Sequence, residues 1–142
     1  MLGERLFPLG QQHHTSFLVR VPHASGLLDG TVKPETVFAE TDHRSHRVST
    51  EEKKRQWQVA GLKKVDQLRF IHEQTGRTLG QAALQFILTE PAVASVLPNI
   101  YNEALLREFA TAPDSTPLRA DDVERIQELY AANFGLETPA TS

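Results

Sequence analysis

Residues 17–30 read Phe-Leu-Val-Arg-Val-Pro-His-Ala-Ser-Gly-Leu-Leu-Asp-Gly, and this stretch joins a strand to a tight loop. The run Phe17–Val21 is rich in strand-forming residues and predicts a short buried strand, although it carries the charged side chain of Arg20. The proline, the small residues and the two glycines after this run are typical of a turn. Small residues directly after a buried strand allow another group to approach the backbone closely.

Composition limits the classes of protein to be considered. The 142 residues, 39% of them hydrophobic, suffice for one domain with a sizeable core. A net charge of −3 favours neither nucleic acid nor an anionic membrane as a partner, and the lack of cysteine excludes disulfides, zinc–thiolate sites and thiol nucleophiles. The N-terminus lacks the apolar core of a signal peptide, and no apolar run could span a bilayer. We therefore expect a cytoplasmic protein.

Capping signals predict where the first helices begin. A helix is expected from Leu2 to about His14, although it contains a proline and a glycine. Ser49 and Glu52 have the spacing of a capping box, and the helix that they begin is expected to end at Gly76 in a left-handed cap. Its apolar side is predicted to comprise Trp57, Gly61, Leu62, Val65, Leu68 and Ile71.

The second half of the chain has equally clear signals. Thr78 and Gln81 form another capping-box spacing, and the apolar helix over 79–88 is predicted to be well buried. A short strand over 93–97 comes next, and Asn102 can cap a helix that runs to about Ala112. The last helix is predicted to end at Gly135 and to turn these residues inward: Val123, Ile126, Leu129, Tyr130 and Phe134.

The predicted order is a helix, a strand, two helices, a second strand and two helices. Strands that alternate with helices predict an α/β protein with a parallel sheet. Two parallel strands cannot cover their own edges and faces, however, and a complete (β/α)₈ barrel needs about 250 residues. The chain is thus expected to form part of a larger architecture.

Several segments together resemble the aldo-keto reductases. Residues 17–30 resemble the seventh strand of that family and its following loop, which has the pattern Pro-Leu-x-x-Gly-x-Leu-x-Gly. Residues 78–88 are similar to the family's helix of the form Thr-x-x-Gln-x-Ala-Leu-x-Trp, and residues 93–99 to its eighth strand. The resemblance implies that residues 1–142 are one partial domain, the C-terminal portion of a TIM (β/α)₈ barrel with two parallel strands and surrounding helices.

The resemblance also implies a function. A full barrel of this family reduces aldehydes or ketones with NADP(H) or NAD(H). The Asp, Tyr, Lys and His that transfer protons in the family lie in the first half of its barrel, and no segment of this chain matches them, so no catalytic residue is assigned. The alternatives are a catalytically inactive fragment, or a nucleotide-binding or interaction module that docks to a partner. The exposed strand edges also favour self-association.

The resemblance places in this chain the part of the barrel that binds the dinucleotide. Arg20 replaces an aromatic residue that stacks on the nicotinamide, and a guanidinium plane can also stack on a ring. Small residues and free backbone amides are expected to line the pyrophosphate, and Tyr101 is expected to stack on adenine. The residues implied to bind the cofactor are Arg20, Val21, His23, Ser25, Gly26, Leu28, Leu97, Pro98, Asn99, Tyr101, Leu105 and Glu108.

Simpler interpretations remain open for these residues. Arg20 and Tyr101 are also consistent with exposed side chains that bind nothing, and the glycines with loop geometry alone. The only cation over 99–109 is Arg107, so a modest preference for NADP(H) over NAD(H) is expected.

The histidine-rich run Asp42-His-Arg-Ser-His46 could offer two or three metal ligands, but no further ligand at a known spacing accompanies it. The family has a similar Asp-x-Arg in this loop without a metal. The basic residues over 43–55 lack interleaved aromatic residues and include two glutamates, so they predict a solvated face rather than a nucleic-acid site.

Overall fold

The computed structural model describes residues 2–46 and 50–136. The first half of the chain forms α1 (Leu2–Gln12), β1 (Phe17–Arg20), α2 (His43–His46) and α3 (Glu51–Asp66). The second half forms α4 (Leu79–Leu88), β2 (Val93–Leu97), α5 (Glu103–Ala110) and α6 (Ala120–Ala131). Short 3₁₀ turns lie at Ala24–Gly26, Arg69–Ile71, Ala112–Asp114 and Asn133–Gly135. Apart from the short helix α2, this is the order predicted from the sequence.

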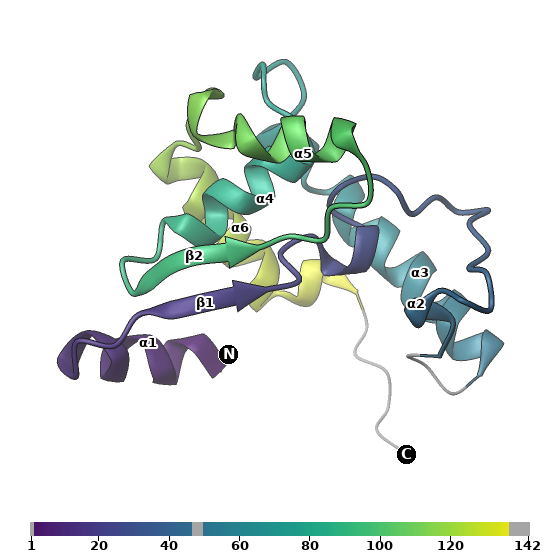
Figure 1. Ribbon diagram of the computed structural model, residues 1–142, viewed down its shortest axis with the longest axis horizontal. Helices are drawn as coiled ribbons and strands as arrows, with labels where there is room; N and C mark the ends of the chain where they lie inside the picture. The colour runs from purple at the N-terminus through teal and green to yellow at the C-terminus, as the bar shows by residue number, and fades with distance from the viewer. Residues whose placement is uncertain (1, 47–49, 137–142) are drawn as a thin grey trace.

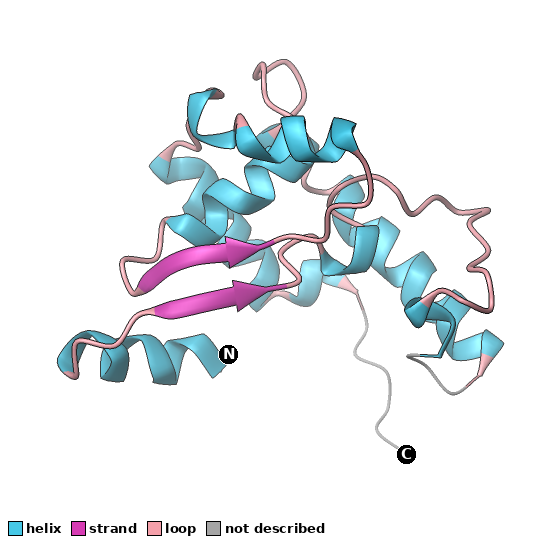
Figure 2. Cartoon of the chain, viewed as in Figure 1, coloured by secondary structure: helices cyan, strands magenta, loops and turns pink. Residues whose placement is uncertain are grey.

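The two strands pair in parallel, as predicted. Phe17 lies opposite Val93 and Arg20 lies opposite Leu97, with one irregularity in the register after Phe17. Figure 1 shows both arrows pointing toward the same cluster of loops, with α1 beyond β1 and α4 and α5 beyond β2. The pairing thus brings the loop after β1 and the loop after β2 to the same edge of the sheet (Figure 2).

One face of the sheet packs on helices and the other does not. Val96 contacts a buried cluster formed by Leu84, Leu105, Phe109 and Ala112, from α4, α5 and the turn after it. Because side chains alternate along a strand, the neighbouring residues point the opposite way. On that side Leu18 is 63% exposed and Leu97 is 48% exposed. We call this side, formed by Leu18, Arg20, Ser95 and Leu97, the open face.

Helix α4 is central to the core, which confirms the prediction that it is well buried. Its Ala82 belongs to a second buried cluster with Leu68, Ile71 and Ile126, while its Leu84 belongs to the cluster beneath Val96. A helix with apolar residues on most sides can pack on two neighbours at once. Within residues 2–46 and 50–136, no helix combines the length and apolar character needed to cross a membrane.

The helix caps agree with the sequence signals where these lie in the described residues. Thr78 Oγ1 accepts a hydrogen bond from the Gln81 amide at 3.1 Å, and Gln81 Oε1 accepts one from the Thr78 amide at 3.0 Å, which completes the predicted capping box. Asn102 caps α5, since its Oδ1 accepts a hydrogen bond from the Leu105 amide at 2.9 Å. Ser49 lies outside the described residues. The residue that caps α3 is Thr50, which accepts from the Lys53 amide.

Several predicted boundaries were wrong. Helix α5 ends at Ala110 rather than at about Ala112, and α6 ends at Ala131 rather than at Gly135, which lies in a separate 3₁₀ turn. Helix α1 ends at Gln12 rather than at His14, and β1 ends at Arg20 because Val21 has a φ of +55° that no strand residue adopts. Helix α3 ends at Asp66 and not at Gly76. Gly76 does have a left-handed φ of +78°, but it precedes Thr78 in a separate turn.

Packing explains the early end of α3. Leu68 and Ile71 reach the core from the turns after the helix, so their burial outweighs local helix propensity. The predicted inward position of Tyr130 was also wrong, since this side chain is 52% exposed. Ile126 and Phe134 do pack on the core, as predicted.

A buried arginine connects the turns around the core. The Arg77 side chain is 2% exposed, and its Nη2 lies 3.5 Å from Asp122 Oδ2 in α6. Its Nη1 donates to the carbonyl oxygens of Thr116 and Pro117 at 2.8 and 2.6 Å, and its Nε donates to that of Ile71. One guanidinium thus satisfies three backbone carbonyls and a buried carboxylate from separate segments.

The loop after β1 has an unusual backbone. Val21, Ala24 and Ser25 have φ values of +55°, +48° and +60°, in a region that residues other than glycine rarely occupy. Gly26 comes next, with a φ of +102°. A Cβ atom at Gly26 would lie 2.5 Å from Thr31 Oγ1 and 3.0 Å from Arg44 Nη1. Glycine is therefore required here both by conformation and by space.

We predict that Arg77→Ala lowers the free energy of unfolding by about 3 kcal/mol or more, because it leaves the Asp122 carboxylate buried without one of its cations and three carbonyls without a donor. Arg107→Ala is the control. It removes an exposed ion pair with Glu103 and should change stability by less than about 0.5 kcal/mol. Urea denaturation followed by circular dichroism measures both, and equal effects would contradict the structural role of Arg77.

We predict that Gly26→Ala lowers the free energy of unfolding by about 2–3 kcal/mol, from backbone strain and steric conflict together. Gly30→Ala provides a matched control, since Gly30 also has a positive φ, of +71°, but has open space around it. Gly30→Ala should lower the free energy of unfolding by about 1 kcal/mol, from backbone strain alone. Thermal and urea unfolding of the two variants should differ accordingly; a larger loss for Gly30→Ala would show that the crowding at Gly26 is unimportant.

Candidate functional site

The segments after the two strands meet at a small hollow. Its volume is about 10 Å³, which suits at most one water molecule. The residues that line it are Val21, Pro22, His23, Ser25, Gly26, Asp29, Asn99 and Tyr101. In open α/β sheets ligands bind outside the carboxyl ends of the strands, so this position is the one expected for a site.

A larger hollow lies beside the first and shares Val21 and Ser25 with it. Its volume is about 440 Å³, within the range of small-molecule sites. Its other lining residues are Ala24, Phe38, Arg44, Lys54 and Trp57. A still larger hollow of about 690 Å³ is lined by α3 together with Gly135 and Leu136, away from the loops at the strand ends. We take the pair of hollows at the strand ends as the candidate site.

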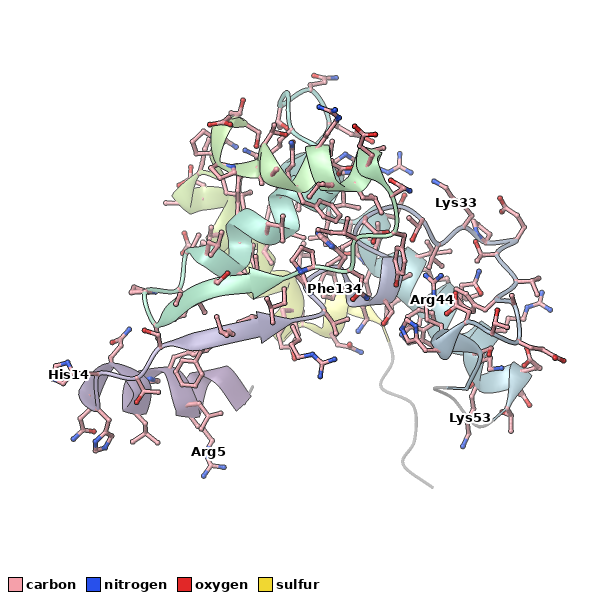
Figure 3. The ribbon with its side chains drawn as sticks, in the orientation of Figure 1. Arg5, His14, Lys33, Arg44, Lys53 and Phe134 are labelled. Carbon is pink, nitrogen blue, oxygen red and sulfur yellow. The ribbon has the colours of Figure 1, made fainter. Side chains whose placement is uncertain are left out.

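Arg44, labelled in Figure 3, contacts the loop after β1 and two aromatic rings. Its Nη1 donates to the carbonyl oxygen of Ser25 at 3.2 Å, and its guanidinium carbon lies 4.5 Å from the ring centre of Phe38 and 5.9 Å from that of Tyr101. Its Nε and Nη2 donate to both carboxylate oxygens of Asp42. These hydrogen bonds lower the pKa of Asp42 to about 2, so the ion pair is fully formed at neutral pH.

His23 is buried between this loop and the helices. Its ring is 4% exposed and stacks on Phe109 of α5, with ring centres 4.2 Å apart. Its Nε2 lies 3.1 Å from the carbonyl oxygen of Gly80 in α4. Burial lowers the pKa of His23, opposed by the hydrogen bond to Gly80 and by the carboxylates of Asp29 and Glu108. The loop after β1 is thus anchored to α4 and α5 by a neutral imidazole.

Several amides of the loop are already used. The Ala24 amide donates to the Val21 carbonyl oxygen, and the Gly26 and Leu28 amides both donate to that of His23. Of the positions where free backbone amides were expected, Leu28 therefore has its amide already hydrogen-bonded within the loop. The reason is the tight turn itself, whose left-handed residues direct these N–H groups back toward the loop.

The structure brings together half of the residues that the resemblance implies. Val21, His23, Ser25, Gly26, Asn99 and Tyr101 line the small hollow. Leu97 and Pro98 lead into it, while Arg20 pairs in register with Leu97 on the open face and is not among the lining residues.

The remaining three have other partners. Leu105 is buried in the cluster beneath Val96, and Leu28 packs against the cluster around Ala82. Glu108 Oε1 accepts a hydrogen bond from the Thr78 hydroxyl.

Sequence reasoning missed the contribution of residues 29–57. Asp29, Phe38, Arg44, Lys54 and Trp57 line the two hollows. The spacing Asp42-x-Arg44 was visible and permits a local ion pair, but nothing in the irregular segment around it indicated that it folds back onto Ser25 and Tyr101. Within residues 2–46 and 50–136, no group of three or more His, Asp or Glu side chains could bind a metal.

Comparisons with known proteins agree with this architecture. The model of the Aldo/keto reductase family matches residues 3–131. The chain is similar to the aldo-keto reductase AKR11C1 from Bacillus halodurans in its holo form, with 27% identity and a TM-score of 0.56 over 89% of this chain and 36% of that one. It also has the fold of the glycerol dehydrogenase AKR11B4 from Gluconobacter oxydans, with 16% identity and a TM-score of 0.66 over 96% of this chain and 40% of that one.

No match was found among curated proteins. The chain spans 36–40% of the length of these solved structures. Its two parallel strands, with the helices that surround them, therefore correspond to a portion of a TIM barrel. Since the family model covers most of its residues, the chain belongs to the aldo/keto reductase family.

Proposed function

We propose that this chain is the C-terminal part of an aldo-keto reductase barrel and binds NADP(H) or NAD(H), the full barrel reducing aldehydes or ketones. The observation that carries this proposal is the convergence of two distant segments, 21–30 and 98–102, at the carboxyl ends of two paired strands. Such an edge is where dinucleotides bind in α/β proteins. The bound dinucleotide supplies the hydride, and the residues of this chain supply its binding and orientation.

The residues present fit a dinucleotide. Tyr101 is 55% exposed, and its exposed ring is of a kind that can stack on adenine; the Arg44 guanidinium carbon lies 5.9 Å from the ring centre. Val21 and Ser25 line both hollows, and the larger hollow, of about 440 Å³, is the one with space for part of a dinucleotide beside this loop. The larger hollow, with Trp57 and Phe38 in its walls, has a volume that suits part of such a ligand.

Three cations near the site have carboxylate partners. Arg44 is paired with Asp42 and Lys54 with Glu51, at 2.6 and 2.5 Å. Arg107, on α5, is paired with Glu103 at 2.5 Å. A 2′-phosphate would have to compete with these carboxylates, so we expect NADP(H) to be preferred over NAD(H) by far less than several hundredfold, which would need about 3–4 kcal/mol.

A second candidate function is supported by the open face. Leu18 and Leu97 expose apolar surface beside a strand edge, and such surface favours association. An interaction module that docks to a partner providing further strands would use this face. The two functions are compatible, because the proposed nucleotide site lies beyond the strand ends.

We predict that Tyr101→Ala weakens NADPH binding about tenfold or more, since loss of a base-stacking ring costs about 1–3 kcal/mol. Tyr130→Ala is the matched control, because Tyr130 is similarly exposed, 52% against 55%, but lies on α6. Fluorescence titration of NADPH on the full chain measures both variants, and a parallel titration with NADH measures the preference. Absence of NADPH binding by the unsubstituted chain would refute the proposed function.

We predict that these 142 residues alone do not oxidise NADPH with small aldehydes and do not remain monomeric. Reduction of a carbonyl needs a proton donor at the developing alkoxide. The two tyrosines of the chain are not assigned this role: Tyr101 is proposed to stack on adenine, and Tyr130 lies on α6. Absorbance of NADPH over time and light scattering test the two statements. If the chain oxidises NADPH and a single substitution in it abolishes this turnover, the prediction of inactivity is wrong. If the chain is a monomer that unfolds cooperatively, the prediction of association is wrong.

A further inference from the structure

His23 has one ring nitrogen with a partner and one without. Because the carbonyl oxygen of Gly80 can only accept a hydrogen bond, Nε2 at 3.1 Å carries the proton in the neutral ring. Nδ1 then presents a lone pair. This atom is buried and has no hydrogen-bond partner among the described residues. A buried polar atom left unpaired costs free energy, which makes the position of Nδ1 noteworthy.

The ring cannot easily turn to relieve this arrangement. Its stacking on Phe109, with an interplanar angle of 25°, and its hydrogen bond to Gly80 fix it from α5 and α4. His23 also lines the small hollow, together with Ser25, Asn99 and Tyr101. The hollow has room for no more than one water, so a larger group must bind above it, at the border that it shares with the larger hollow.

Two opposing influences act on the protonation of His23, and burial is the larger. Burial lowers its pKa, whereas the carboxylates of Asp29, in its own loop, and Glu108, in α5, act to raise it. Arg44 approaches the same loop through the Ser25 carbonyl oxygen, but its charge is paired with Asp42. Helix α4 contributes no charged residue. One additional negative charge near the ring would therefore shift the balance toward the imidazolium form.

We propose that binding of an anionic group at the border of the two hollows is coupled to the uptake of one proton at His23 Nδ1. The anionic group is the diphosphate of the dinucleotide. The inference rests on the proposed function and adds a regulation of the same site. Diphosphate oxygens only accept hydrogen bonds, so the lone pair of the neutral ring repels them, while a protonated Nδ1 donates to them or to a water between. The proton comes from solvent, no covalent bond other than N–H forms, and Nε2–H remains on the Gly80 oxygen.

This coupling is particular to this chain. The pattern that residues 17–30 resemble has leucine where His23 stands, and leucine neither titrates nor bonds to Gly80. Affinity should therefore rise as the pH falls below the ordinary imidazole value of about 6.5, by at most about tenfold per pH unit, the limit for one proton.

The test is calorimetric titration of the full chain with NAD⁺ and NADP⁺ between about pH 5.5 and 8, in buffers that differ in ionisation enthalpy. The 2′-phosphate of NADP⁺ titrates in this range whereas the diphosphate does not. The contribution of His23 is therefore the difference in proton uptake between the unsubstituted chain and His23→Gln. Glutamine can still donate to Gly80 but does not titrate. We expect proton uptake at His23 to be absent in this variant and in His23→Leu, and unchanged in the control His13→Gln, whose side chain is exposed.

The outcomes separate the two proposals. Nucleotide binding with equal proton uptake in the unsubstituted chain and in His23→Gln would overturn the coupling and leave nucleotide binding intact. No binding of either dinucleotide at any pH would overturn both. If His23→Gln unfolds, two other measurements test the inference. One is proton uptake in His23→Leu, and the other is the chemical shifts of the His23 ring in the unsubstituted chain with and without NAD⁺. A ring that stays neutral in the complex at pH values near 6 would contradict the inference.

Discussion

The parallel pairing of β1 with β2 is the constraint on which the rest of this structure depends. It brings Arg20 beside Leu97, and so places residues 21–30 and 98–102 next to each other although α2, α3 and α4 separate them in sequence. Parallel strands need such a crossover, and the helices that make it supply the core. Everything assigned to the candidate site depends on this pairing, because each strand alone would present only one of the two segments.

Local signals in the sequence predicted those parts of the fold that local interactions determine. The capping box of Thr78 and Gln81 formed as expected, because both partners lie within one turn of helix. The strand over 93–97 was confirmed with the same bounds. The end of α3 was not predictable in this way, because it depends on Leu68 and Ile71 packing against Ala82, a contact between separate segments.

The same distinction applies to the candidate site. The resemblance of residues 17–30 to a family motif drew attention to the loop after β1, and six of the implied residues line one hollow. The motif could not give the fold-back of residues 31–46, since an irregular segment has no periodicity to reveal its path. Arg44 lies over the ring of Phe38 and donates to Ser25, and these contacts exist only once the loop is closed. They add a cationic and a second aromatic wall beside Tyr101 of the segment after β2.

The pairing of three cations near the site with their own carboxylates has a consequence for kinetics. Arg44 with Asp42, Lys54 with Glu51 and Arg107 with Glu103 form close pairs whose fields cancel within a few ångströms. Fast capture of anions normally relies on an uncompensated positive field that extends through solvent, and it slows steeply as salt screens that field. Here a dinucleotide would meet almost no long-range attraction. Its association rate should then be set by diffusion and by fit to the loop, and should depend little on ionic strength.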